Sequence, residues 1–172
     1  MSVGERLLDG IRAMRQGERR PDRGADARER LEAAGDGARV RDEVRVTVTS
    51  DKDIVRASRR GRQIAEDSGF ASSDPTLIAT AISELARNIF WYATQGEIIL
   101  RLIENGGREG IEVVALDEGP GIRDVSLAMQ AGYSTSGSLG LGLPGIRRLM
   151  DEFRINSRVG EGTTVIVRKW KR

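Results

Sequence analysis

The sequence contains no histidine and no cysteine among its 172 residues. Without histidine, the chain cannot use histidine-based acid–base catalysis, Ser-His-Asp hydrolysis, the usual zinc sites or autophosphorylation on histidine. Without cysteine, the fold needs no disulfide. The sequence also lacks a charged-then-apolar leader and any apolar run near the roughly 18 residues that a membrane span needs. We therefore expect a cytoplasmic protein with no membrane segment.

An excess of charge of one sign is lacking as well. Lysine and arginine number 28 against 26 aspartate and glutamate residues, which gives a net charge of +2. The charges are mixed along the chain, a weak basis for nucleic-acid binding. Arg59-Arg60 and the "RKWKR" of residues 168–172 keep a nucleic-acid binder as a minor alternative, and we expect no nucleic-acid partner.

The apolar content of 38% suffices for the core of one domain, and its distribution divides the chain near residue 42. Residues 16–42 carry few large apolar groups and predict a charged, flexible linker. Residues 43–172 predict the folded domain. Residues 1–15 predict an amphipathic helix, whose apolar positions are Val3, Leu7, Ile11 and Met14. Its stripe either packs on its own domain or docks on another protein.

The folded domain alternates strand and helix patterns. "EVRVTVT" alternates as a half-buried strand does, Ser50 with Asp53 predicts a helix start, and Asn105-Gly106 predicts a hairpin. The expected elements are a strand at 43–49, helices from 51 and over 74–96, strands at 97–104 and 111–117, a helix over 144–153 and a final strand pair around 160–162. The order predicts an α+β fold, a two-layer sandwich with helices on one face of a sheet.

A carboxylate and an amide lie four residues apart in the helix predicted after Asp74-Pro75. Glu84 and Asn88 fall together at the margin of its apolar face, about 80–120° from the apolar centre at 100° per residue. By themselves they could equally be an ordinary pair on a helix surface.

Asp117 ends the strand "IEVVALD" and is followed by Gly119 and Gly121. A carboxylate at a strand end, beside glycines that permit close approach, could accept hydrogen bonds from the amino group of a purine. The D-x-G-x-G pattern alone is also a common turn composition.

A glycine-rich stretch, "STSGSLGLGLPG", precedes the helix predicted at residue 144. Gly140 to Gly145 match G-x-G-x-x-G, but no strand precedes them and no βαβ unit follows, so the dinucleotide interpretation fails. Glycines before a helix N-terminus still form an anion site suited to phosphates.

These three motifs, in this order, resemble the Bergerat ATP-binding fold of the GHKL superfamily of gyrase-type ATPases, Hsp90 and histidine kinases. The resemblance implies ATP and Mg²⁺ as cofactors and a mixed sheet with helices on one face. It makes Glu84 the catalytic base and Asn88 the Mg²⁺ ligand. It also implies nucleotide binding by Asp117, Gly119, Gly121, Gly140, Gly142 and Thr163.

Residues 43–170 further resemble the RsbT-type switch kinases of the bacterial stressosome, which are related to anti-sigma factor kinases. This resemblance implies a serine/threonine protein kinase that phosphorylates STAS-domain scaffold or antagonist proteins and activates a PP2C-type phosphatase by binding it. Residues 1–42 have no counterpart in those compact kinases. The alternative function is an anti-sigma factor or nucleotide-dependent binding module with little or no kinase activity.

Overall fold

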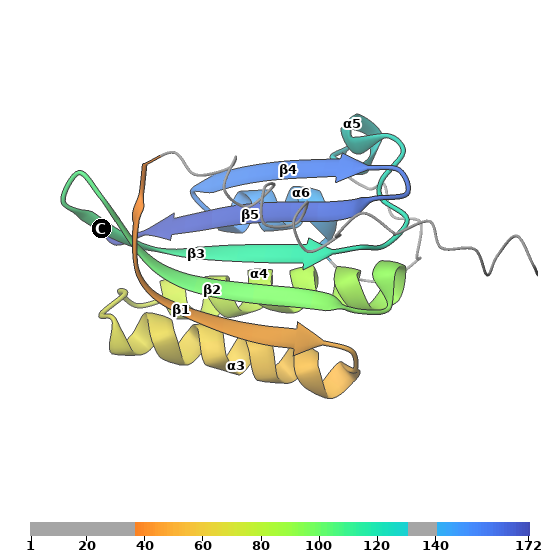
Figure 1. Ribbon diagram of the computed structural model, residues 1–172. Coiled ribbons are helices and arrows are strands. Elements are labelled where there is room, and N and C mark those ends of the chain that lie inside the picture. Colours follow the sequence, from red (N-terminus) through yellow and green to blue (C-terminus); the bar gives the residue numbers. More distant parts are fainter. Residues whose placement is uncertain (1–36, 131–140) are drawn as a thin grey trace, which may run out of the picture. The chain divides into compact units, whose positions relative to one another are not determined.

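The computed structural model describes residues 37–130 and 141–172, which form an α+β sandwich (Figure 1). Five strands form one sheet in the order β1-β2-β3-β5-β4. The elements are, in chain order, β1 (Arg39–Val48), α3 (Asp51–Asp67), α4 (Asp74–Asn88), the π-helical turn η1 (Ile89–Ala93), β2 (Gly96–Asn105), β3 (Arg108–Asp117), α5 (Val125–Ala128), α6 (Gly142–Leu149), β4 (Glu152–Arg158) and β5 (Gly162–Trp170).

The predicted fold class is confirmed, with one correction to the sheet. All four strand pairings are antiparallel, so the expectation of a mixed sheet is wrong for the strands that the structure describes. A hairpin joins β2 to β3, whereas α3, α4 and η1 lie between β1 and β2 in the chain. The strand β5 then inserts between β3 and β4, which places the end of β3 beside the start of β5.

Helices α3, α4 and α6 cover one face of the sheet (Figure 1). The central helix α4 supplies Ile78, Ile82 and Leu85, each no more than 1% exposed, and Ile89 continues its apolar side. Burying such a side chain stabilises the fold by roughly 1.5–3 kcal/mol. Gly61 of α3 permits close contact, because a Cβ there would lie 2.0 Å from Cδ1 of Ile82. The core therefore fixes α4 firmly against both the sheet and α3.

Several element boundaries differ from the prediction. Strand β1 begins at Arg39, inside the segment expected to be linker, because its register with β2 extends to Glu104. The helix expected over 74–96 is α-helical to Asn88, and Gly96 begins β2. The helix expected over 144–153 ends at Leu149, where β4 pairing with β5 replaces helix continuation.

Several predictions fall outside the described residues. The amphipathic helix at 1–15, most of the linker at 16–42 and Gly140 lie there. Within the described ranges, no helix is long and apolar enough to cross a membrane.

The basic C-terminal stretch belongs to the sheet. Arg168 and Lys169 are 3% and 4% exposed in β5, and they form ion pairs with Glu112 and Asp151. The nucleic-acid alternative loses this part of its basis, because these cations are paired inside the fold.

Candidate active site

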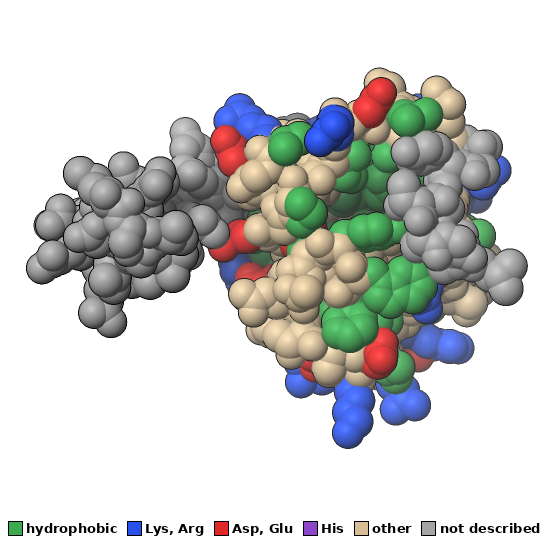
Figure 2. Space-filling model, turned by 90° about the vertical axis from the view of Figure 1, so that its right-hand side faces the viewer, with side chains coloured by type: hydrophobic (Ala, Val, Ile, Leu, Met, Phe, Trp, Pro, Cys, Tyr) green, Lys and Arg blue, Asp and Glu red, His purple; other side chains and the backbone are tan. Residues whose placement is uncertain are grey.

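A cavity of about 440 Å³ lies where β3 and α4 both end. Its volume is within the roughly 300–1,000 Å³ typical of small-molecule sites. Figure 2 shows this end of the molecule, where hydrophobic side chains gather around a hollow. The described residues that line it include apolar side chains from η1, the loop after β3, α5, α6 and β5: Trp91, Pro120, Ile122, Leu127, Leu143 and Val165. Such a lining suits a planar, partly apolar ligand.

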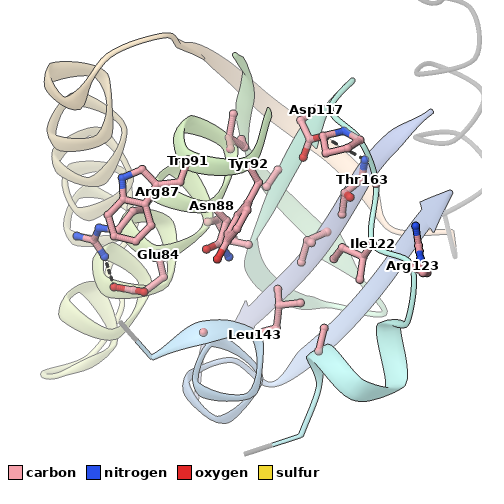
Figure 3. Close-up of a pocket in the computed structure, with 18 of the residues that line it drawn as sticks. Glu84, Arg87, Asn88, Trp91, Tyr92, Asp117, Ile122, Arg123, Leu143 and Thr163 are labelled. Carbon is pink, nitrogen blue, oxygen red and sulfur yellow. Dashed lines mark hydrogen bonds and ion pairs between the residues drawn. The ribbon is translucent and has the colours of Figure 1, made fainter. Parts of the chain in front are cut away.

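Helix α4 brings three polar side chains to one wall of the cavity. Arg87 and Asn88 come three and four residues after Glu84, which places both on the same side of the helix as Glu84. Glu84 is 9% exposed and forms an ion pair with Arg87. Figure 3 shows Glu84, Arg87 and Asn88 projecting from this helix, across the cavity from Asp117 and Thr163.

The π-helical turn η1 continues α4 and carries two aromatic residues to the cavity. Trp91 and Tyr92 line it and are 45% and 47% exposed. The guanidinium of Arg87 lies 5.8 Å from the centroid of the Trp91 ring, within the range of a cation–π contact. A π turn inserts one residue relative to an α turn, and such turns are frequent at functional sites.

Asp117 lies at the end of β3 with its carboxylate oriented by backbone groups. Its Oδ1 accepts hydrogen bonds from the N–H groups of Gly119, at 2.8 Å, and Thr163, at 3.3 Å. An ionised carboxylate offers about four lone-pair sites, so Asp117 can also accept a hydrogen bond from a ligand. Because Asp117 lines the cavity, its position suits an exocyclic amino group.

The two glycines after Asp117 have different surroundings. Gly121 lines the cavity and adopts φ +72°, and a Cβ there would lie 2.1 Å from the carbonyl oxygen of Arg158. Gly119 is not among the lining residues, and a Cβ there would lie 2.6 Å from Cβ of Ala93. Both glycines therefore allow the loop to pack against the protein itself, and Gly121 also borders the cavity.

Thr163 is the first residue of β5 after Gly162 and is 8% exposed. Its hydroxyl lies 2.8 Å from that of Ser157, which accepts a hydrogen bond from the N–H of Ile122. This network ties the start of β5, strand β4 and the loop after β3 together at the cavity.

The structure describes only part of the glycine-rich motif that was predicted to bind phosphates. Gly142 begins α6 with φ +61° and lines the cavity beside Leu143, whereas Gly140 lies outside the described residues.

The polar lining suits a divalent cation that arrives with phosphates. Residues 37–130 and 141–172 contain no cluster of three acidic side chains that could hold a metal by themselves. Mg²⁺ commonly uses one or two protein oxygens, substrate phosphates and water. The amide oxygen of Asn88, beside the carboxylate of Glu84, fits that smaller role.

The structure thus gathers six predicted site residues around one cavity: Glu84, Asn88, Asp117, Gly121, Gly142 and Thr163. Sequence reasoning missed Arg87, Trp91 and Tyr92. The three-residue spacing of Glu84 and Arg87 was a visible signal for an ion pair. The π turn that brings both aromatic residues to the cavity has no such signal.

Comparisons with known proteins agree on one family. The family described as "Histidine kinase-like ATPase domain" matches residues 47–169. The chain is 47% identical over 133 residues to serine/threonine-protein kinase RsbT of Bacillus subtilis (strain 168), covering 77% of this chain and 100% of RsbT. It is 33% identical over 111 residues to the anti-sigma F factor of Thermoanaerobacter sp. (strain X514), covering 58% of this chain and 76% of that protein.

A solved structure supports the fold. The RsbU and RsbW domains of Rv1364c from Mycobacterium tuberculosis match with a TM-score of 0.50 and 22% identity, over 76% of this chain and 32% of that one. At this identity the match supports the architecture alone.

Proposed function

The chain belongs to the histidine kinase-like ATPase domain family and is a protein serine/threonine kinase of the RsbT type, and we propose that its substrates are STAS-domain proteins of a cytoplasmic partner-switching pathway. It transfers the γ-phosphate of ATP to a serine or threonine of such a protein. It then activates a PP2C-type phosphatase by binding it.

One observation carries the catalytic part of this proposal. A single cavity has Asp117 and Thr163 on one side and Glu84 with Asn88 on the other. The first pair recognises adenine, and the Asp117 carboxylate accepts a hydrogen bond from the adenine amino group. The second pair faces the triphosphate. The apolar lining between them holds the purine and excludes water, which strengthens electrostatic interactions with the phosphates.

Asn88 binds Mg²⁺ through its amide oxygen. When bound, Mg²⁺ supplies positive charge against the triphosphate. Gly142, at the start of α6, places backbone near the phosphates, and its lack of a side chain keeps that approach open. The three lysines of the chain are Lys52, Lys169 and Lys171, and none of the described lining residues is a lysine.

Glu84 acts on the incoming hydroxyl. The serine or threonine oxygen forms a bond to the γ-phosphorus while the bond from that phosphorus to the β–γ bridging oxygen breaks. ADP leaves and the hydroxyl proton passes to the Glu84 carboxylate. The low exposure of Glu84 keeps bulk water from competing for this position.

The identity of the partners rests on similarity. A full-length match at 47% identity to a kinase named RsbT favours a switch kinase. The weaker match to anti-sigma F factors supports the alternative of a binding module with little transfer activity. A transfer assay separates these functions.

The test uses label transfer from γ-labelled ATP to a purified STAS-domain protein. Wild-type protein should label a serine or threonine, and Glu84→Gln should lower the rate by roughly 10²–10⁴, the usual contribution of a positioned base. Glu66→Gln is the matched control, because Glu66 is an exposed residue of α3 that pairs with Arg62. ATP binding without transfer to any STAS-domain protein would favour the binding module instead.

A further inference from the structure

The carboxylate that we assign as the base is engaged by a neighbour on its own helix. Nη1 of Arg87 forms an ion pair and hydrogen bond with Oε1 of Glu84. The side chain of Glu84 is 12% exposed and that of Arg87 is 32% exposed. Since the pair is partly buried, solvent screens it less than a surface pair.

This ion pair opposes catalysis. A carboxylate oxygen that accepts a charge-assisted hydrogen bond from a guanidinium has less capacity to accept the proton of an incoming hydroxyl. Glu84 in this conformation is held back from acting as a base.

Trp91 provides an alternative contact for the guanidinium. Arg87 already lies over its ring, 5.8 Å from the centroid. Trp91 is 45% exposed at the rim of the cavity, one turn beyond Arg87, so a protein that approaches the cavity can reach it. Figure 3 shows Arg87 between Glu84 and Trp91.

We propose that Arg87 is a positioning residue that restrains Glu84 until the protein substrate contacts the cavity rim at Trp91. That contact draws the guanidinium away from Glu84 and leaves the carboxylate free to accept the hydroxyl proton. The inference rests on the proposed function, since it takes Glu84 to be the base. It predicts that the protein hydrolyses ATP slowly when its protein substrate is absent.

The test compares ATP hydrolysis without protein substrate in wild type, Arg87→Gln, Arg87→Lys and Arg62→Gln. In this reaction water attacks the γ-phosphorus, ADP leaves, and the proton of water passes to Glu84. Arg87→Gln should raise kcat for hydrolysis by roughly 10- to 100-fold, the factor that corresponds to losing one charge-assisted hydrogen bond. The Kd for ATP should stay within about twofold of wild type.

Two further variants separate this role from a structural one. Arg87→Lys retains the charge and should keep hydrolysis low. Arg62→Gln is the matched control, because Arg62 pairs with Glu66 in the same type of helical ion pair on α3, away from the cavity. It should leave hydrolysis unchanged.

Trp91→Ala tests the second half of the inference. Because Trp91 also lines the cavity, the comparison is between two reactions of the same variant: kcat for transfer to the protein substrate should fall by a larger factor than kcat for basal hydrolysis. If Arg87→Gln weakens ATP binding or lowers hydrolysis, Arg87 serves the nucleotide and the inference is overturned. Unchanged transfer kinetics in Trp91→Ala would also overturn it.

The experiments distinguish a failure of the proposed function from a failure of the inference about Arg87. If no STAS-domain protein is phosphorylated while Arg87→Gln still raises hydrolysis, the restraint on Glu84 stands and the substrate assignment is wrong. If Glu84→Gln hydrolyses ATP at the wild-type rate, the catalytic assignment of Glu84 fails, and the inference fails with it.

Discussion

Asp117 and Thr163 face each other across the β3–β5 ladder, and the backbone N–H of Thr163 donates to Oδ1 of Asp117 at 3.3 Å. The carboxylate is thereby held at the strand end by backbone groups of both β5 and its own loop. A side chain fixed in this way is preorganised for a ligand and needs little rearrangement on binding.

Asp117→Asn should weaken ATP binding and leave the fold intact. The amide keeps the shape, but loses the charge that accepts from the adenine amino group, a loss of about 1.5–3 kcal/mol for a hydrogen bond to a charged group. Titration with a fluorescent ATP analogue measures the change, and the melting temperature without nucleotide serves as a check of folding. Equal affinities would remove Asp117 from the adenine site.

Asn88→Ala should abolish the increase in ATP affinity that Mg²⁺ provides. We expect wild-type protein to bind ATP more tightly with Mg²⁺ than with EDTA, and the variant to bind equally in both, with phosphoryl transfer lost. The matched control is Asn156→Ala, because Asn156 is an exposed residue of β4 outside the cavity. A variant that retains its Mg²⁺ dependence would contradict the assignment.

Asp151 predicts a pH dependence of stability. Burial raises the pKa of its carboxyl, but hydrogen bonds from the Trp170 N–H and Lys169, together with the Lys169 charge, outweigh burial, and its pKa is lower than usual. The pKa of an aspartate is about 3.9 in the unfolded chain, and that of Asp151 is lower in the folded state. The Asp151 carboxylate therefore stabilises the folded state at pH values above about 3.9, and this stabilisation is lost as the pH falls through its folded-state pKa.

Asp151→Asn should therefore lower the free energy of unfolding at pH 7 by about 1 kcal/mol, a figure reduced for partial exposure. The difference between wild type and variant should shrink as the pH falls below about 4. Urea denaturation at pH 7 and at pH 3 measures it. A difference that stays constant with pH would show that the carboxylate charge contributes nothing.

A chain that starts at residue 37 should fold and bind ATP as the full-length protein does. The described elements from β1 onward supply the core and the cavity. Starting at residue 43 instead should destabilise the domain, because it removes the pairing of Arg39 with Glu104 and of Val40 with Ile103. Thermal unfolding of both truncations checks this. A large loss of stability at residue 37 would mean that the segment before it contributes to the folded domain.

The sequence predicted the element types because local patterns determine them. Val44, Val46 and Val48 alternate along β1, and Ser50 with Asp53 begins α3 through the hydrogen bond from the Ser50 N–H to the Asp53 carboxylate. The end of α6 could not be predicted from local sequence. Asp151 is drawn into pairing with β5 by its N–H bond to the carbonyl of Arg168, a contact between residues far apart in the chain.

Sequence reasoning could name those cavity residues that carry a polar side chain or lack a side chain. Glu84, Asn88 and Asp117 are distinctive by their chemistry. The apolar wall was not predictable, because Ile122, Leu143 and Val165 have the same composition as core residues and meet only when the loop, helix and strand are assembled. The Arg87 guanidinium contacts Glu84 and the ring of Trp91, and its contact with Trp91 depends on the π turn.

The strand order has a consequence for folding kinetics. The hairpin pairings β2–β3 and β4–β5 join residues close in sequence, whereas β1–β2 pairs Val48 with Gly96 and β3–β5 pairs Asp117 with Thr163, which are 48 and 46 residues apart. Closing a long loop has an entropic cost that precedes its contacts, so such pairings form slowly. The loop closed by the β3–β5 pairing contains Gly121, Ile122 and Gly142. A nascent chain therefore has no nucleotide site until β5 pairs with β3, so ATP can bind and stabilise only the completed fold.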